Sequence, residues 1–112
     1  MKVEILSGGE VIGVGELDHL DPPMGVAFGP FIPTTAYDRT RHAGIIDGNE
    51  NDLGLSATLV ARGPHGEIEC SAVGIQDAQD ALGEIEVSVL GISEFETYFG
   101  DHPDYKGYYG LT

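Results

Sequence analysis

Apolar and polar residues alternate at the start of the chain in the period-two pattern of a half-buried β-strand. Residues 2–5 (KVEI) alternate in this way, and the turn-forming sequence SGGE follows at residues 7–10. Paired glycines supply the positive φ angles that a tight hairpin needs. We therefore expect a β-hairpin, with residues 11–17 as the return strand.

The longest alternation in the chain lies between residues 53 and 75. Leucine or alanine occupies every second position of residues 53–61, and the turn sequence GPHG follows at residues 63–66. Apolar and polar residues then alternate again over residues 67–72. Glycine and proline together favour a turn, so the pattern predicts a second hairpin over residues 53–75. A last strand is expected over residues 85–89, where isoleucine and valine alternate with polar residues.

A nearly continuous apolar segment covers residues 26–32 and indicates a buried strand. Pro30 within it favours an edge position or a bulge, because proline cannot donate a ladder hydrogen bond. Residues 18–25 contain the stiff pair Pro22-Pro23 and are expected to form a loop.

Short helices are expected over residues 34–42 and 76–82. Thr34 or Thr35 can cap the first helix. Each segment is followed by a glycine at the position where a helix would end: Gly44 and Gly83.

A third short helix is expected over residues 93–99. Ser93 and Glu96 have the spacing of a capping box, and Gly100 follows as a stop. The remaining tail, residues 101–112, either packs across the sheet or stays mobile. It carries three tyrosines: Tyr105, Tyr108 and Tyr109.

Together these elements predict one mainly β (α+β) domain spanning residues 1–112. We expect a curled, mostly antiparallel sheet or half-barrel of about six strands, with one to three short helices. A parallel sheet would need long helical crossovers between strands, and the sequence contains none.

The charge balance is strongly acidic, with 19 Asp and Glu against five Lys and Arg and a net charge of −14. Such a charge repels nucleic acid and anionic membranes, so neither is expected as a direct partner. Two interpretations remain open: a solubility or salt-adapted surface, or a docking surface for a basic protein. Met1–Leu6 lacks a secretory signal and no apolar stretch could span a membrane, so a cytoplasmic location is expected.

Motifs for cofactors and catalysis are weak. The acidic sequence at residues 47–52 begins like a calcium loop, but Asp52 and Thr58 stand where an EF-hand needs glycine and glutamate. The histidines lack metal-ligand spacing, and Cys70 fits a small core residue better than a reactive thiol. We expect no cofactor or metal and favour a protein that is not an enzyme, although catalytic groups distant in sequence could still converge.

Three functional hypotheses follow. The first is an acidic binding domain that engages a basic protein through carboxylates on two strands: Glu67, Glu69, Glu84 and Glu86. These four would share one solvent face if their strands were neighbours.

The second hypothesis is a self-associating domain, a homodimer, that uses the apolar segment Met24, Val26, Phe28 and Phe31. The third is a small-molecule or metal-dependent site built from residues distant in sequence. Asp38 and His42 are its starting point, because residues four apart lie on the same face of a helix.

Overall fold

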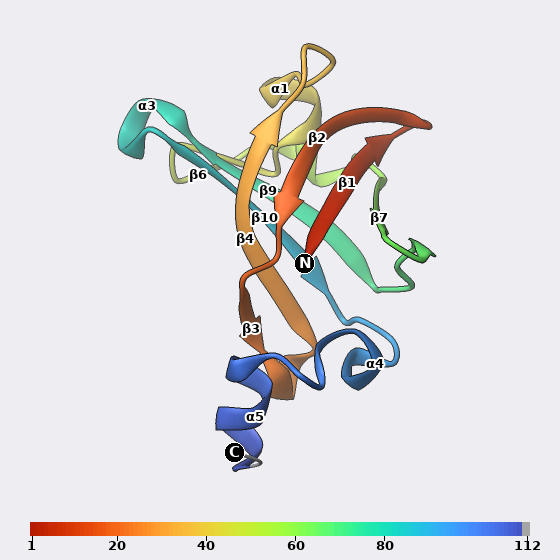
Figure 1. Ribbon diagram of the computed structural model, residues 1–112. Coiled ribbons are helices and arrows are strands. Elements are labelled where there is room, and N and C mark those ends of the chain that lie inside the picture. Colours follow the sequence, from red (N-terminus) through yellow and green to blue (C-terminus); the bar gives the residue numbers. More distant parts are fainter. Residues whose placement is uncertain (111–112) are drawn as a thin grey trace.

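The protein folds as a curled, unclosed β-sheet with short helices at its two ends, as seen in a computed structural model that describes residues 1–110 (Figure 1). The strands are β1 Lys2–Ser7, β2 Glu10–Glu16, β3 His19–Asp21, β4 Val26–Pro33, β5 Ile45–Ile46, β6 Asn49–Glu50, β7 Leu59–Gly63, β8 Gly66–Glu67, β9 Ala72–Ala78 and β10 Glu84–Leu90. The helices are the 3₁₀ helix η1 Pro22–Met24, α1 Arg39–His42, α2 Asp52–Leu55, α3 Gln79–Leu82, α4 Phe95–Phe99 and α5 Pro103–Tyr109.

The sheet runs in the order β6-β5-β9-β10-β4-β2-β1-β7-β8, and β3 pairs with β4 beside this path. Every pairing is antiparallel except that of β5 with β9. Strand β4 holds the curl together, because its residues 27–30 pair with β10 and its residues 31–33 pair with β2. The predicted fold class is confirmed, but the sheet has ten strands rather than six, and the described residues form five α-helices rather than one to three.

The core lies on the inner side of the curl, where alternate residues of β1, β2, β9 and β10 are buried. Gly13 and Gly15 of β2 face this interior. A Cβ at Gly13 would overlap the ring of Phe31, and one at Gly15 would lie 2.7 Å from Val87 Cγ1. The two glycines therefore leave room for larger side chains from β4 and β10, which accounts for glycine inside a strand.

The first hairpin forms as the sequence predicts. Gly8 and Gly9 have φ angles of 57° and 83°, the left-handed conformation of a tight hairpin turn. Ile5 pairs with Gly13 and Leu6 with Val11, so Ile12 is an extra residue on β2. This β-bulge increases the local twist of the sheet.

The predicted strand over residues 53–61 is wrong in its first half. Residues 52–55 form α2, and β7 begins only at Leu59. The Asn51 side chain donates to the carbonyl oxygens of Thr40 and Ala43 at 2.7 and 2.8 Å, which ties the start of α2 to α1. These tertiary contacts override the alternating pattern.

The structure also corrects several boundaries. The expected loop 18–25 contains β3 and η1, while β4 is an interior strand despite Pro30. Asp38 rather than a threonine caps α1. Helix α4 starts without a side-chain cap, so the expected capping box does not form.

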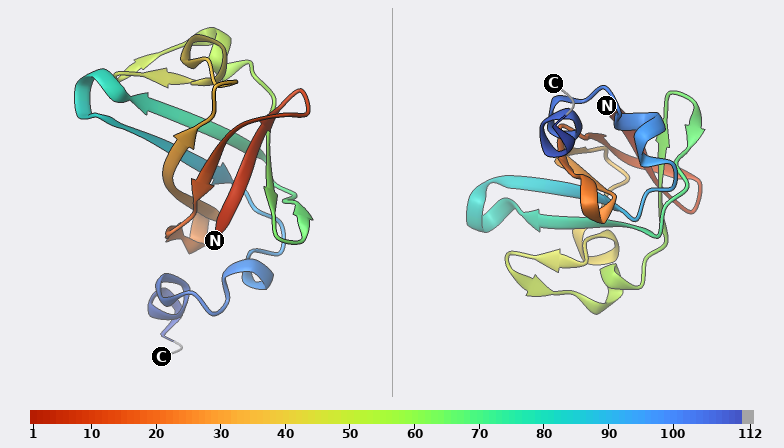
Figure 2. Two further views of the ribbon diagram at one scale, coloured as in Figure 1. Left: turned by 45° about the horizontal axis from the view of Figure 1, so that its top comes forward. Right: turned by 90° about the horizontal axis from the view of Figure 1, so that it is seen from below.

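Helices gather at two opposite ends of the sheet (Figures 1 and 2). Helices α1 and α2 lie with β5 and β6 at one end, and α4 and α5 lie at the other. In the expected tail, α5 contacts β3, because the backbone N–H of Leu20 donates to Asp104 Oδ2 at 3.2 Å. The ring of Tyr105 lies 6.1 Å from that of Phe95, between centroids.

Candidate functional site

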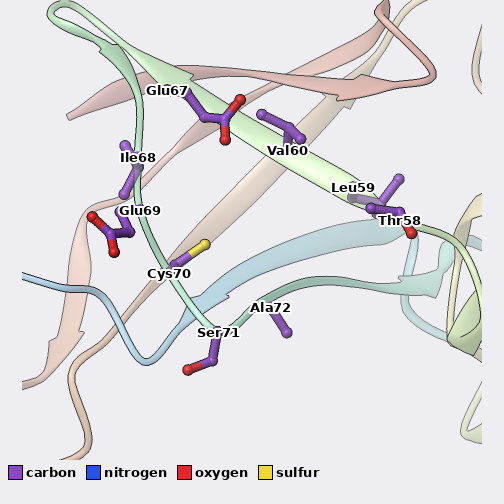
Figure 3. Close-up of a pocket in the computed structure, with 9 residues that line it drawn as sticks. All are labelled: Thr58, Leu59, Val60, Glu67, Ile68, Glu69, Cys70, Ser71 and Ala72. Atoms are coloured by element: carbon purple, nitrogen blue, oxygen red, sulfur yellow. The ribbon is translucent and has the colours of Figure 1, made fainter.

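The sheet leaves a cleft of about 420 Å³ where its curl fails to close. Residues 58–60 form one side of the cleft and residues 67–72 form the other (Figure 3). No ladder joins β7 to β9 within residues 1–110. We call this feature the seam cleft.

The seam cleft opens because the chain after β8 changes its hydrogen-bonding partners. Ile68 N still donates to Ala61 O at 2.8 Å, which continues the β7–β8 hairpin. The next residues turn away: Ser71 N donates to Leu90 O at 2.8 Å, and Glu69 O accepts from Ser93 N at 2.9 Å. The chain thus bonds to the end of β10 instead of β7, and a gap remains between the two.

Two carboxylates border the seam cleft. Glu67 and Glu69 are both exposed, and Figure 3 shows the Glu67 carboxylate pointing toward Val60 across the opening while Glu69 points outward. The cross-strand neighbour of Glu67 is Arg62, but its guanidinium pairs with Glu4 Oε1 at 2.7 Å. Neither Glu67 nor Glu69 belongs to a salt bridge among residues 1–110.

The wall of the seam cleft is largely uncharged. Leu59 and Ile68 are buried there, and the Cys70 sulfur points into the opening (Figure 3). Burial, and then the charge of Glu67, raise the pKa of the Cys70 thiol above its ordinary value. The Cys70 thiol is therefore protonated at neutral pH. It offers a polarisable contact to the cleft and is not a nucleophile.

The other two predicted carboxylates lie elsewhere. Glu84 and Glu86 are on β10, which pairs with β9 and β4. Glu67 is on β8, which among the described strands pairs only with β7. Glu84 is exposed and Glu86 is half-buried opposite Gln76 and Pro30. The strands are not neighbours, so the four carboxylates form two separate pairs.

The apolar segment proposed for self-association is divided between two faces of β4. Val26 and Phe28 are half-buried on the outer face, where Phe28 packs against the His19 ring at 5.4 Å. Phe31 lies on the inner face, is 4% exposed and contacts Tyr37 in the core. Met24, on η1, is the exposed member of the group.

Asp38 and His42 are in contact, but through the backbone of Asp38. Asp38 N donates to His42 Nδ1 at 3.0 Å, and the Asp38 carboxylate accepts from Thr40 N. The contact closes the single turn of α1 and buries His42.

An ionic network beside α1 was missed by the sequence analysis. Arg39 donates to three carboxylates, those of Asp47, Asp77 and Asp80, at 2.9–3.0 Å. The Tyr37 hydroxyl also donates to Asp77, at 2.6 Å. Asp77 was missed because residues 76–82 were predicted to form a helix. In the structure Asp77 lies near the end of strand β9 and is buried. The one signal in the sequence was the excess of acidic over basic residues, which favours the pairing of one arginine with several carboxylates.

Comparison of the chain with models of protein families, with curated proteins and with solved structures found no match. Within residues 1–110, no group of three or more His, Cys, Asp or Glu side chains has an arrangement that could hold a metal ion. None of the helices described is both long and apolar enough to span a membrane.

Proposed function

We propose that the protein is a small acidic, non-enzymatic binding domain that engages a basic protein, and that a Lys or Arg side chain of the partner enters the seam cleft. The observation that carries the proposal is the pair Glu67 and Glu69, which border this cleft without a salt bridge among residues 1–110.

The cleft suits both parts of a long basic side chain. The apolar stem of lysine or arginine can lie along Leu59, Val60 and the Cys70 thiol, which line the opening. The charged head can then bond to the Glu67 carboxylate, and charge-assisted hydrogen bonds are about twice as strong as neutral ones. Catalysis is not needed to explain this arrangement.

The remaining charge would act over a longer range. A net charge of −14 raises the encounter rate with a basic partner by electrostatic steering. Glu84 and Glu86 on β10 would contribute in this way, together with the other carboxylates, without forming the central contact.

The proposal is tested by capturing partners from a cell lysate on three immobilised baits and quantifying the retained proteins by mass spectrometry. The baits are the natural chain, E67Q/E69Q, and the matched control E84Q/E86Q, which removes the same charge from another part of the sheet. We expect a basic protein to be retained by the natural chain and by E84Q/E86Q but lost from E67Q/E69Q. Equal retention by all three baits would contradict the seam cleft as the binding site. Absence of any basic partner at low salt would contradict the proposed function.

A further inference from the structure

A second hollow, of about 390 Å³, lies at the opposite end of the sheet from α5, between α1, α2 and the end of β1. Its lining combines donors with a small apolar wall: Ser7, Arg41, His42, Leu53, Ser56 and Ala57. It is separate from the seam cleft and shares no residue with it. We call it the α1–α2 hollow.

His42, which lines this hollow, has a hydrogen-bond donor that it does not use within residues 1–110. Its Nδ1 accepts from Asp38 N at 3.0 Å, so the neutral ring carries its proton on Nε2. Nε2 has no hydrogen-bond partner within residues 1–110, and it is not among the buried unpartnered atoms. The side chain is otherwise enclosed, with 4% of the residue exposed and the Tyr37 ring stacked on it. Nε2 therefore keeps some access to its surroundings, and the α1–α2 hollow is a cavity that His42 lines.

Arg41 adds a cation with no carboxylate partner. The five salt bridges within residues 1–110 involve Met1, Arg39 and Arg62 as the cations, and none involves Arg41. Arg41 is thus an arginine without a salt bridge among residues 1–110, in a chain with 19 acidic residues, and it lines the same hollow as His42.

We infer that the α1–α2 hollow binds a small organic carboxylate, held by Arg41 and the Nε2–H of His42, with its apolar portion against Leu53 and Ala57. Arginine is suited to this role, because its planar guanidinium matches the two oxygens of a carboxylate. A second donor from His42 fixes the direction of the bound group. The apolar wall favours a carboxylate with a short branched chain over an inorganic anion.

The backbone of α1, which carries both Arg41 and His42, is held in place before any ligand arrives. Arg39, two residues before Arg41, bonds to Asp77 on β9 and to Asp47 after β5. Asn51 binds the carbonyl oxygens of Thr40 and Ala43 from the other side. Helix α1 is thereby fixed at both ends, which lowers the entropy cost of binding.

Charges of both signs act on the His42 ring. Burial, and then the charge of Arg41, favour the neutral form, while Asp38 and Glu10 favour the charged form. Burial and Arg41 prevail, so the pKa of His42 lies below its ordinary value and the ring stays neutral. The net charge repels anions at a distance, but at about 0.15 M salt this repulsion is screened beyond roughly 8 Å.

The test is an NMR titration with isobutyrate at constant ionic strength, followed through the His42 ring and the methyl groups of Leu53. We expect saturable shifts at both places, and a dissociation constant raised about tenfold or more in R41Q, as expected for loss of a hydrogen bond to a charged group. The matched control R62Q, which removes an arginine from β7, should bind as the natural chain does. Isobutyramide, the uncharged analogue of the same shape, should give no saturable shift.

Three results would overturn the inference. The first is the absence of saturable shifts with isobutyrate in the natural chain. The second is equal binding by R41Q and the natural chain. The third is tighter binding of inorganic phosphate than of isobutyrate, which would assign the hollow to another anion. None depends on a basic partner, so this inference and the proposed function can fail separately.

Discussion

Arg39 and Asp77 are joined by a hydrogen bond of 3.0 Å between Nη2 and Oδ1, across 38 residues of sequence. The Asp77 side chain is fully buried, and its other oxygen accepts from Tyr37 and Gln79 at 2.6 and 2.8 Å. A buried carboxylate is tolerated only when its oxygens are paired in this way. Asp77 therefore connects α1 and its preceding loop to the end of β9.

Replacing Asp77 tests this connection. D77N keeps the shape of the side chain but removes its charge and one acceptor oxygen, leaving Tyr37 and Arg39 with weaker partners. We expect the free energy of unfolding to fall by about 1.5–3 kcal/mol, the range for hydrogen bonds to charged groups. Urea denaturation measures the change. D80N is the matched control, because Asp80 bonds to the same arginine from an exposed position and should have little effect.

The same carboxylate makes stability depend on acid pH. Burial alone would raise the pKa of Asp77, but hydrogen bonds from Tyr37 and Gln79, together with the charge of Arg39, lower it below its ordinary value of 3.8. The unfolded chain therefore binds a proton first as the pH falls. Stability from Asp77 is complete above about pH 4 and is lost as the pH falls through the folded-state pKa.

Urea midpoints measured from neutral pH into this acid range check the sign. The difference in stability between the natural chain and D77N should shrink as the pH falls, since Asp77 becomes uncharged in both states. A difference that stays constant with pH would show that the Asp77 charge does not stabilise the fold.

Local sequence patterns predicted those elements that local chemistry controls. The glycines at residues 8 and 9 fix the first hairpin, and Gly83 ends α3 with a φ angle of 71°. The alternation of β10 was also read correctly. A strand was expected at β4 as well, but only alternate residues of its first six are buried, not the whole apolar segment. Strands β5, β6 and β8 have two residues each, too few for a periodic pattern to be seen.

The candidate sites could be predicted only in part. Glu67 and His42 were selected from the sequence, because alternation exposed the first and its spacing from Asp38 marked the second. Arg41 and Leu53 were not, since their meeting depends on how α1 packs against α2. The alternating pattern at residues 53–57 predicted a strand, so the contact between α1 and α2 was not expected.

Gly54 allows α1 and α2 to pack together. Replacing it with alanine should destabilise the protein, although helix propensity alone predicts stabilisation. Alanine normally stabilises an exposed helix position by up to about 1 kcal/mol relative to glycine. A Cβ at Gly54, however, would overlap the carbonyl group of Ala43. We expect G54A to lower the free energy of unfolding by roughly 1–3 kcal/mol, as overpacking does. G107A in α5, where a Cβ meets nothing within 4 Å, should be neutral or stabilising. Thermal denaturation of both variants distinguishes the two effects.

Tyr37 should be the last tyrosine to ionise in the folded protein. Burial, and then the hydrogen bond to Asp77, raise its pKa far above the ordinary value of 10.0. The unfolded chain releases this proton first, so the stability from Tyr37 is present below pH 10 and declines as the pH rises further. In an alkaline titration followed by phenolate absorbance, the natural chain should show a late component that is absent from Y37F. The prediction would be contradicted if Y37F lost its absorbance change in the pH range where ordinary tyrosines ionise and the late component remained.

The two pairs of glutamates should affect different rate constants once a basic partner is identified. Exposed charges away from the contact act mainly through long-range attraction, so E84Q/E86Q should slow association, and added salt should reduce the difference from the natural chain. Glu67 lies against the cleft wall and would bond directly to the partner, so E67Q/E69Q should also speed dissociation. Dissociation dominates affinity differences between related complexes. Surface plasmon resonance at several salt concentrations separates the two constants. If both variants changed only the association rate, the carboxylates would act only through long-range attraction. The seam cleft would then not be the contact site.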